Sequence, residues 1–130
     1  MPLFYIDTHA RALADLGFLS EQKNTIKSFE IKPGSLVGTI ARKFPKDKIT
    51  DADGIVVVQG PGSFSAIRAG VLVANLLSRI FAKPLYGITV EESGSLAEVV
   101  KKISSGNLKK LKYADPIYDA EPNITMSKKI

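Results

Sequence analysis

The residues best placed for chemistry are Asp7 and a turn made of Gly60, Pro61, Gly62 and Ser63. Asp7 follows a short apolar run where a strand would end, so its carboxylate could face a metal or a phosphate. The turn precedes a long apolar segment, and backbone N–H groups at a helix N-terminus can bind phosphate. It lacks the lysine of a P-loop. A tight strand-to-helix turn is therefore the preferred interpretation, with Asp7 in a turn or capping role.

Two further side chains could take part in a site. His9 is the single histidine in a chain without cysteine, and a zinc or iron site needs several converging ligands. We therefore predict no metal and no cofactor. Arg68 falls in the first turn of the predicted long helix, where a cation opposes the helix dipole. A phosphate or a partner carboxylate would account for Arg68, and solvent exposure is the alternative.

The elements that position these residues centre on residues 54–81. Ile55 to Val58 form a β-branched apolar run that predicts a strand buried on both faces. Glycine and proline then break the strand, and Ser63 is predicted to cap a helix over residues 63–81. That helix is apolar on nearly every face, so most of it must be buried.

The remaining pattern predicts an α/β fold. Strands are expected at residues 3–6, 12–19 and 25–31 as an antiparallel meander, followed by a helix at 35–44, a charged loop at 46–53, a strand at 84–90, a helix at 95–104 and a short strand at 108–113. This order predicts a mixed sheet of about five strands with helices packed over it. It is the order of one RNase H-like half-domain of the actin, sugar kinase and Hsp70 superfamily. We expect a domain over residues 1–113 and an extended tail over 114–130.

Charge and targeting signals indicate what the protein could bind and where in the cell it works. The net charge is +5, and seven lysines but three acids lie from Lys101 onward. A solvated, lysine-rich tail is the preferred interpretation, and a basic surface that attracts phosphate backbones is the alternative. The N-terminus lacks a signal peptide and no apolar stretch reaches the ~20 residues of a membrane span. Together with the absence of cysteine, this predicts a cytoplasmic protein and no membrane contact.

Residues 59–70, Gln-Gly-Pro-Gly-Ser-Phe-Ser-Ala-Ile-Arg-Ala-Gly, resemble the Gly-Pro-Gly-Ser-Phe-Thr-Gly-Leu-Arg-Ile-Gly signature of the bacterial TsaB (YeaZ) family. The resemblance extends to Ile6-Asp7-Thr8, to Lys83-Pro84-Leu85-Tyr86-Gly87-Ile88, and to two tail segments, Asp115-Pro116-Ile117-Tyr118 and Glu121-Pro122-Asn123-Ile124-Thr125. Asp119 departs from the basic residue usual in the family. The interval before the tail also looks too short for the family's second subdomain, so the chain resembles a reduced form.

The resemblance implies a non-catalytic subunit of the machinery that makes N6-threonylcarbamoyladenosine in tRNA. Its implied partners are a catalytic TsaD-type paralogue and a TsaE-type ATPase, with tRNA contacted indirectly. It implies pairing, with the paralogue or in a homodimer, through the two helices at residues 35–44 and 63–81. The implied interface residues are Leu36, Ile40, Ile67, Ala69, Gly70, Val71, Ala74 and Ser78. The alternative is a homodimeric nucleotide-binding hydrolase or phosphotransferase with Asp7 and the glycine turn at its cleft. A third, weaker option is direct tRNA binding through Lys109, Lys110 and Lys112.

Overall fold

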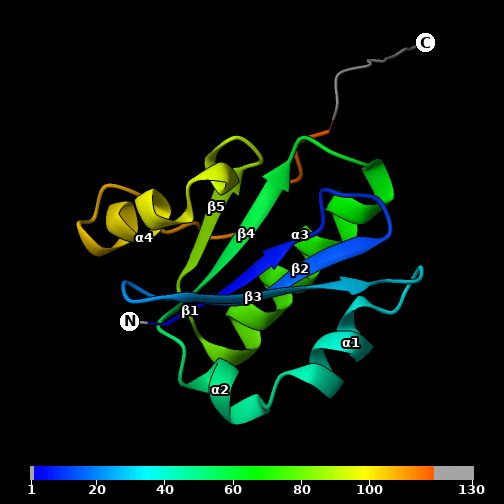
Figure 1. Ribbon diagram of the computed structural model, residues 1–130, viewed down its shortest axis with the longest axis horizontal. Helices are drawn as coiled ribbons and strands as arrows, with labels where there is room; N and C mark the ends of the chain where they lie inside the picture. The colour runs from blue at the N-terminus through cyan, green and yellow to red at the C-terminus, as the bar shows by residue number, and fades with distance from the viewer. Residues whose placement is uncertain (1, 119–130) are drawn as a thin grey trace.

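A computed structural model describes residues 2–118 of the chain, which form one five-stranded mixed sheet (Figure 1). The strand order is β3-β2-β1-β4-β5. Strands β1 (Leu3–Asp7), β2 (Leu13–Leu19) and β3 (Asn24–Glu30) make the predicted antiparallel meander. Strands β4 (Gly54–Gly60) and β5 (Leu85–Thr89) extend the sheet in parallel from β1. The predicted α/β class and mixed five-stranded sheet are confirmed.

Helices cover both faces of this sheet. One face carries α1 (Leu36–Lys43), α2 (Lys46–Thr50) and α3 (Phe64–Phe81), whose apolar side chains share a core with Phe4, Ile6, Ile55 and Val57. The other face carries the 3-10 helix η1 (Glu92–Gly94) and α4 (Leu96–Ser104), the latter packed on Leu3, Tyr5, Val56 and Val58. Figure 1 shows α4 lying away from α1 and α2.

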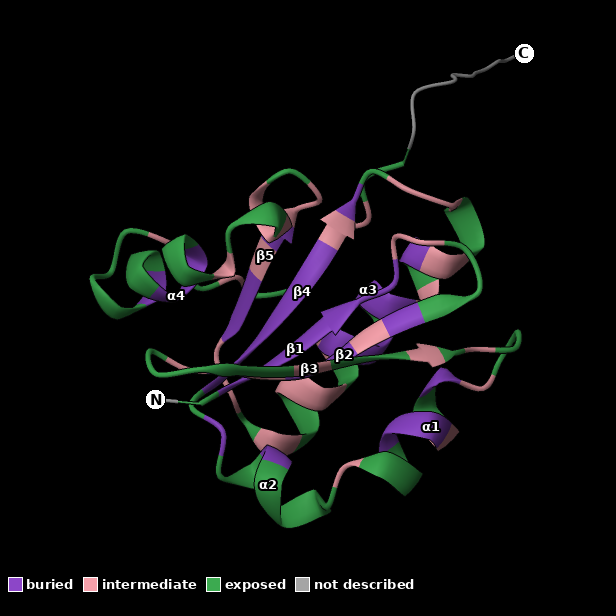
Figure 2. Cartoon of the chain, in the orientation of Figure 1, coloured by how far each residue is buried: buried purple, intermediate pink, exposed green. Residues whose placement is uncertain are grey.

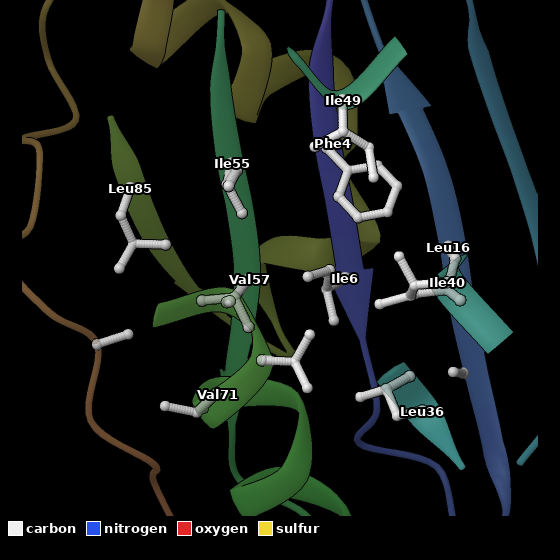
Figure 3. Close-up of a cluster of buried hydrophobic side chains, with 14 of the residues drawn as sticks. Phe4, Ile6, Leu16, Leu36, Ile40, Ile49, Ile55, Val57, Val71 and Leu85 are labelled. Atoms are coloured by element: carbon white, nitrogen blue, oxygen red, sulfur yellow. The ribbon is translucent and has the colours of Figure 1, made fainter. Parts of the chain in front are cut away.

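The division of the apolar core into one cluster on each face of the sheet follows from strand geometry. Successive side chains of a strand point to opposite faces, and β1 and the apolar part of β4 are buried on both. Ile55 and Val57 therefore point to the α3 side and Val56 and Val58 to the α4 side. Figure 3 shows Ile6, Ile55 and Val57 of the sheet facing Val71 of α3 and Leu36 of α1. The apolar run that predicted a doubly buried strand thus holds two helical layers together.

Three local predictions are wrong. The charged stretch after α1 contains the short helix α2, anchored by the buried side chain of Ile49. The predicted strand at residues 108–113 is reduced to one antiparallel bridge between Leu85 and Leu111. Ser63 occupies the N-cap position of α3, but its hydroxyl makes no capping hydrogen bond. The Ser63 carbonyl accepts the first intrahelical hydrogen bond, from the Ile67 N–H at 2.9 Å.

Helix α3 has the length and composition of a membrane-spanning helix. This is weak evidence, because a core helix of a soluble protein meets the same criteria. One side of α3 packs on the sheet through Ile67, Gly70, Val71, Val73 and Ala74. Only 28% of α3 is buried in the described part of the chain, so the prediction that most of this helix is buried is wrong for the single chain.

Candidate functional site

The glycine-proline turn ends β4 and begins α3. Gly60 has φ +125°, a conformation that side-chain-bearing residues rarely adopt, and the Gly60–Pro61 peptide bond is cis. A Cβ atom built on Gly62 would lie only 2.9 Å from the carbonyl oxygen of His9. The turn therefore lies directly against the chain that leaves β1. This places Asp7 and the first turn of α3 in one neighbourhood, which is the arrangement that the alternative enzyme interpretation requires.

Asp7 is buried and already bound by its own chain. Its carboxylate accepts hydrogen bonds from the His9 backbone N–H at 3.0 Å and from the Tyr5 hydroxyl at 3.2 Å. The Nδ1 atom of His9 lies 2.6 Å from Asp7 Oδ1. Burial first, and then the nearby Asp7 charge, raise the pKa of Tyr5 far above its usual value. The arrangement is a turn that ties β1 to the residues after it.

Thr8 fixes the end of β1 to α3. Its hydroxyl donates a 2.7 Å hydrogen bond to the Ala66 carbonyl, and a Cβ at Gly70 would overlap the Thr8 side chain. Gly70 thus allows α3 to lie close to the turn that follows β1 within its own chain. Among residues 2–118, no group of three or more histidines, cysteines or acids is placed to hold a metal.

The predicted interface residues lie mostly in the chain's own core. Leu36, Ile40, Ile67, Val71 and Ala74 are each at most 4% exposed within the single chain, and Gly70 is also buried. Ala69 and Ser78 are half-buried, and the Ser78 hydroxyl donates to the Lys83 carbonyl. The sequence prediction therefore chose the wrong side of the helix pair for its main residues. An almost wholly apolar helix gives little signal for which side the sheet will cover.

The exposed side of the same helix pair is also apolar. Val37 of α1 and Leu72, Leu76 and Ile80 of α3 are between 44% and 68% exposed; we call these four residues the helix-pair face. Figure 2 shows both buried and exposed residues on α1 and α3, whereas β1 and most of β4 are buried. Large apolar side chains gathered on adjacent helices are typical of a protein interaction surface.

Two hollows border the helix-pair face. One of about 310 Å³ lies among α1, α2 and α3 and is lined by Val37, Leu76 and Ile80 together with Phe44 and Ile49. The other, of about 490 Å³, reaches from Val37 and Leu72 to the polar residues Thr8, Arg11, Lys32 and Ser63. A partner helix that packs on the helix-pair face could place its apolar side chains in these hollows.

A second feature, absent from the predicted site, is the segment at residues 114–118, here called the strap. Asn75 of α3 binds it twice: Nδ2 donates to the Ala114 carbonyl at 3.0 Å, and the Ala114 N–H donates to Oδ1 at 2.7 Å. Gln59 Nε2 donates to the Asp115 carbonyl, and the Ile117 N–H donates to the Gln59 carbonyl. These hydrogen bonds hold residues 114–118 on the domain. Residues 119–130, including Asp119 and the segment 121–125, lie outside the described residues.

Arg68 is exposed and contacts an aromatic cluster at the end of the strap. Its guanidinium lies 5.6 Å from the centroid of the Phe64 ring, a cation–π distance. The Phe64 ring stacks on Tyr118 with centroids 4.5 Å apart. A hollow of about 470 Å³ lies between α3 and the strap. The Phe64 ring provides a neighbour for Arg68 within its own chain, so no phosphate is needed to explain the residue.

The sequence contained a signal for the strap that the prediction did not use. Asn75 interrupts an apolar helix, and Gln59 follows an apolar strand. A buried or half-buried amide normally finds hydrogen-bond partners. Both amides find theirs in the strap, about forty to sixty residues further along the chain.

Comparison with known proteins agrees with the fold. A family model described as TsaD, tRNA N6-adenosine threonylcarbamoyltransferase, matches residues 36–102. That region runs from α1 through the helix-pair face and the glycine turn into α4. No curated protein matches the chain.

Two solved structures share the fold. YeaZ from Pseudomonas aeruginosa is 18% identical with a TM-score of 0.57, and the match covers 68% of this chain and 45% of that one. An uncharacterized protein with similarity to peptidase YEAZ from Pseudomonas aeruginosa gives the same identity and TM-score, with 68% and 43% covered. The matched region therefore spans less than half the length of either structure. At this identity the likeness shows the fold, which is that of half of YeaZ.

Proposed function

The chain belongs to the TsaD family of tRNA N6-adenosine threonylcarbamoyltransferases, whose model matches just over half of it, and we propose that it is a non-catalytic interaction subunit of that modification machinery. Its partner is a catalytic TsaD-type paralogue, which docks on the helix-pair face. A TsaE-type ATPase joins the same assembly, and the chain reaches tRNA through the paralogue. The assembly works in the cytoplasm.

The observation that carries this proposal is the helix-pair face itself. Val37, Leu72, Leu76 and Ile80 are exposed, while the opposite sides of α1 and α3 are used by the core. Exposing four large apolar side chains on adjacent helices is costly in water unless another surface covers them. A structurally related paralogue would present a similar helix pair, so two such pairs would bury each other in a four-helix arrangement.

The state of Asp7 supports a non-catalytic role. Its carboxylate accepts hydrogen bonds from Tyr5 and His9 of its own chain. A carboxylate acting on a nucleotide or a metal would need at least one oxygen turned toward the ligand. Here the acid fixes the end of β1, and the glycine turn serves as a joint between β4 and α3.

Pairing is tested by isothermal titration of the chain with a TsaD-type protein. The test variant is Leu72→Glu with Leu76→Glu, which places two carboxylates on the helix-pair face. Truncation or charging of central interface residues commonly costs 2 kcal/mol or more, so we expect at least about thirtyfold weaker pairing.

The matched control is Gln22→Glu with Thr25→Glu, which adds the same charge at exposed positions on and beside the edge strand β3. The control should bind the paralogue like the unmodified chain. Equal binding by both double variants would show that the helix-pair face is not the docking surface.

The alternative, a homodimeric nucleotide hydrolase or phosphotransferase, has one observation in its favour. Asp7 and the N-terminal turn of α3 lie together, joined through Thr8 and Ala66. Titration of the chain with ATP and with ADP, each with Mg²⁺, separates the two functions. Binding that is lost in Asp7→Asn would favour the enzyme, and absence of heat with either nucleotide would favour the interaction subunit.

A further inference from the structure

A second surface, formed by α4 and the segment that follows it along β5, is basic, and α4 lies on the opposite face of the sheet from the helix-pair face. Lys101 and Lys102 belong to α4, and Lys109, Lys110 and Lys112 follow in the segment after it. These five residues, here called the lysine face, are all exposed. No acidic residue occurs between Val99 and Ala114, so the charge of this stretch is uncompensated along the chain.

Backbone contacts hold the lysine face together. The N–H groups of Asn107 and Leu108 both donate to the Lys102 carbonyl, which folds the following segment back onto the end of α4. Leu111 then pairs with Leu85 on β5 and packs against the α3-side core. The chain bends at Lys112 and Tyr113 directly after this bridge, so the bridge at Leu111 fixes the position of the lysines on either side of it.

Little inside the protein neutralises these lysines. Lys102 approaches Glu92 at 3.8 Å, and within residues 2–118 the other four form no ion pair. Tyr113 stands next to Lys112 and is 62% exposed. A row of unpaired cations with an exposed aromatic ring is the combination that binds a phosphate backbone and stacks on an unpaired base.

The same face is poorly suited to a lipid surface. A helix that lies on a membrane inserts its apolar side between the lipids. The apolar side of α4, formed by Val99, Val100 and Ile103, is buried against the sheet. Tyr113 is the one large exposed apolar side chain of the segment from Leu96 to Tyr113.

We propose that the lysine face binds RNA directly, through the phosphate backbone and with Tyr113 stacking on a base. This deepens the proposed function, on which the choice of tRNA as the RNA rests. Helix α4, which carries Lys101 and Lys102, lies on the opposite face of the sheet from the helix-pair face, so RNA bound there leaves the helix-pair face open to a protein partner.

The test is fluorescence anisotropy of the full chain with an unmodified tRNA transcript over a range of salt concentrations. The test variant converts Lys101, Lys109, Lys110 and Lys112 to glutamine. Each lost phosphate contact lowers the salt slope by about 0.7–0.9, so we expect the slope to fall by roughly three and affinity at low salt to fall tenfold or more. Tyr113→Ala should weaken binding about fivefold while leaving the salt slope unchanged.

The matched control converts Lys23, Lys27, Lys43 and Lys48 to glutamine, four exposed lysines outside the lysine face. It removes the same charge and should keep the slope of the unmodified chain. Equal loss in both quadruple variants, or no loss in either, would overturn the proposal. So would tighter, lysine-face-dependent binding to polyglutamate or to phosphatidylserine vesicles than to tRNA.

The two proposals fail separately. Pairing with a TsaD-type protein is measured without RNA, and RNA binding is measured with the isolated chain. Loss of tRNA binding in the lysine-face variant with intact pairing would support both proposals. Pairing with no detectable tRNA binding would overturn this inference alone.

Discussion

The side-chain amide of Asn75 forms a two-way hydrogen-bonded pair with the backbone of Ala114, at 3.0 Å through its Nδ2 and 2.7 Å through its Oδ1. Ala114 is buried, so its N–H and carbonyl have little access to water. One residue in the middle of α3 therefore satisfies both backbone groups at the start of the strap. The pair fastens the end of the described chain to the helix that carries the helix-pair face.

Replacing Asn75 with leucine should release the strap. Both Ala114 backbone groups would lose their partners, at a cost of about 1–3 kcal/mol in the free energy of unfolding. Urea denaturation measures that cost, and hydrogen exchange at the Ala114 amide reports the strap directly. Arg79→Leu, on an exposed position of the same helix, serves as control. Unchanged exchange at Ala114 in Asn75→Leu would show that the strap is held by its other contacts.

Two glycines in helices should respond to alanine in opposite directions. Gly70→Ala would push a methyl group into Thr8 and disturb the bond from Thr8 to Ala66, costing about 1–3 kcal/mol. Gly38→Ala in α1 meets only the flexible guanidinium of Arg42, at 3.4 Å, and should stabilise by about 0.5–1 kcal/mol. Thermal unfolding of the two variants measures both changes in stability. A stabilising Gly70→Ala would contradict the close approach of α3 to β1.

Tyr5 should make the fold sensitive to high pH. Its pKa is raised in the folded state from an unfolded value of 10.0, so its stabilising contribution is complete below pH 10. Above pH 10 the unfolded chain loses this proton and the folded chain keeps it, which lowers stability by up to about 1.4 kcal/mol per pH unit. Unfolding free energies measured from pH 9 to 11 should fall more steeply for the unmodified chain than for Tyr5→Phe. Parallel curves would show that Tyr5 ionises normally.

The two sides of α3 should tolerate charge very differently. Ala74 is fully buried, so Ala74→Glu should cost about 3–5 kcal/mol or prevent folding. Leu76 is 44% exposed, so Leu76→Glu should change the free energy of unfolding by no more than about 0.5 kcal/mol. Circular dichroism and urea denaturation compare the two. A folded, stable Ala74→Glu variant would place the sheet-facing side of α3 elsewhere.

Local patterns were enough to predict the sheet. The apolar run at Ile55 to Val58, the short polar turns of the meander, and the break at Pro61 depend on neighbouring residues, and each matches the structure. The covered side of α3 could not be predicted in this way, because residues on nearly every side of it are apolar. Its orientation depends on a contact between Gly70 and Thr8, which are sixty-two positions apart.

The strap and α2 escaped prediction for related reasons. The strap has no regular secondary structure, and its attachment depends on single amides at Gln59 and Asn75. In α2 one buried side chain, Ile49, anchors a charged five-residue helix, which is too short to show a period. A hydrogen bond between distant residues, or a single buried side chain in a short helix, produces no periodic pattern in the local sequence and is therefore hard to predict from it.

Reconstitution of tRNA threonylcarbamoylation tests the central claim most directly. The assay contains a TsaD-type protein, a TsaE-type ATPase, unmodified tRNA and the small-molecule substrates, with this chain present, absent, or replaced by the Leu72→Glu, Leu76→Glu variant. We predict that modified adenosine forms only when the unmodified chain is present, and that the folded variant fails to support it. Equal product without the chain, or full activity with the variant, would contradict a role that depends on the helix-pair face.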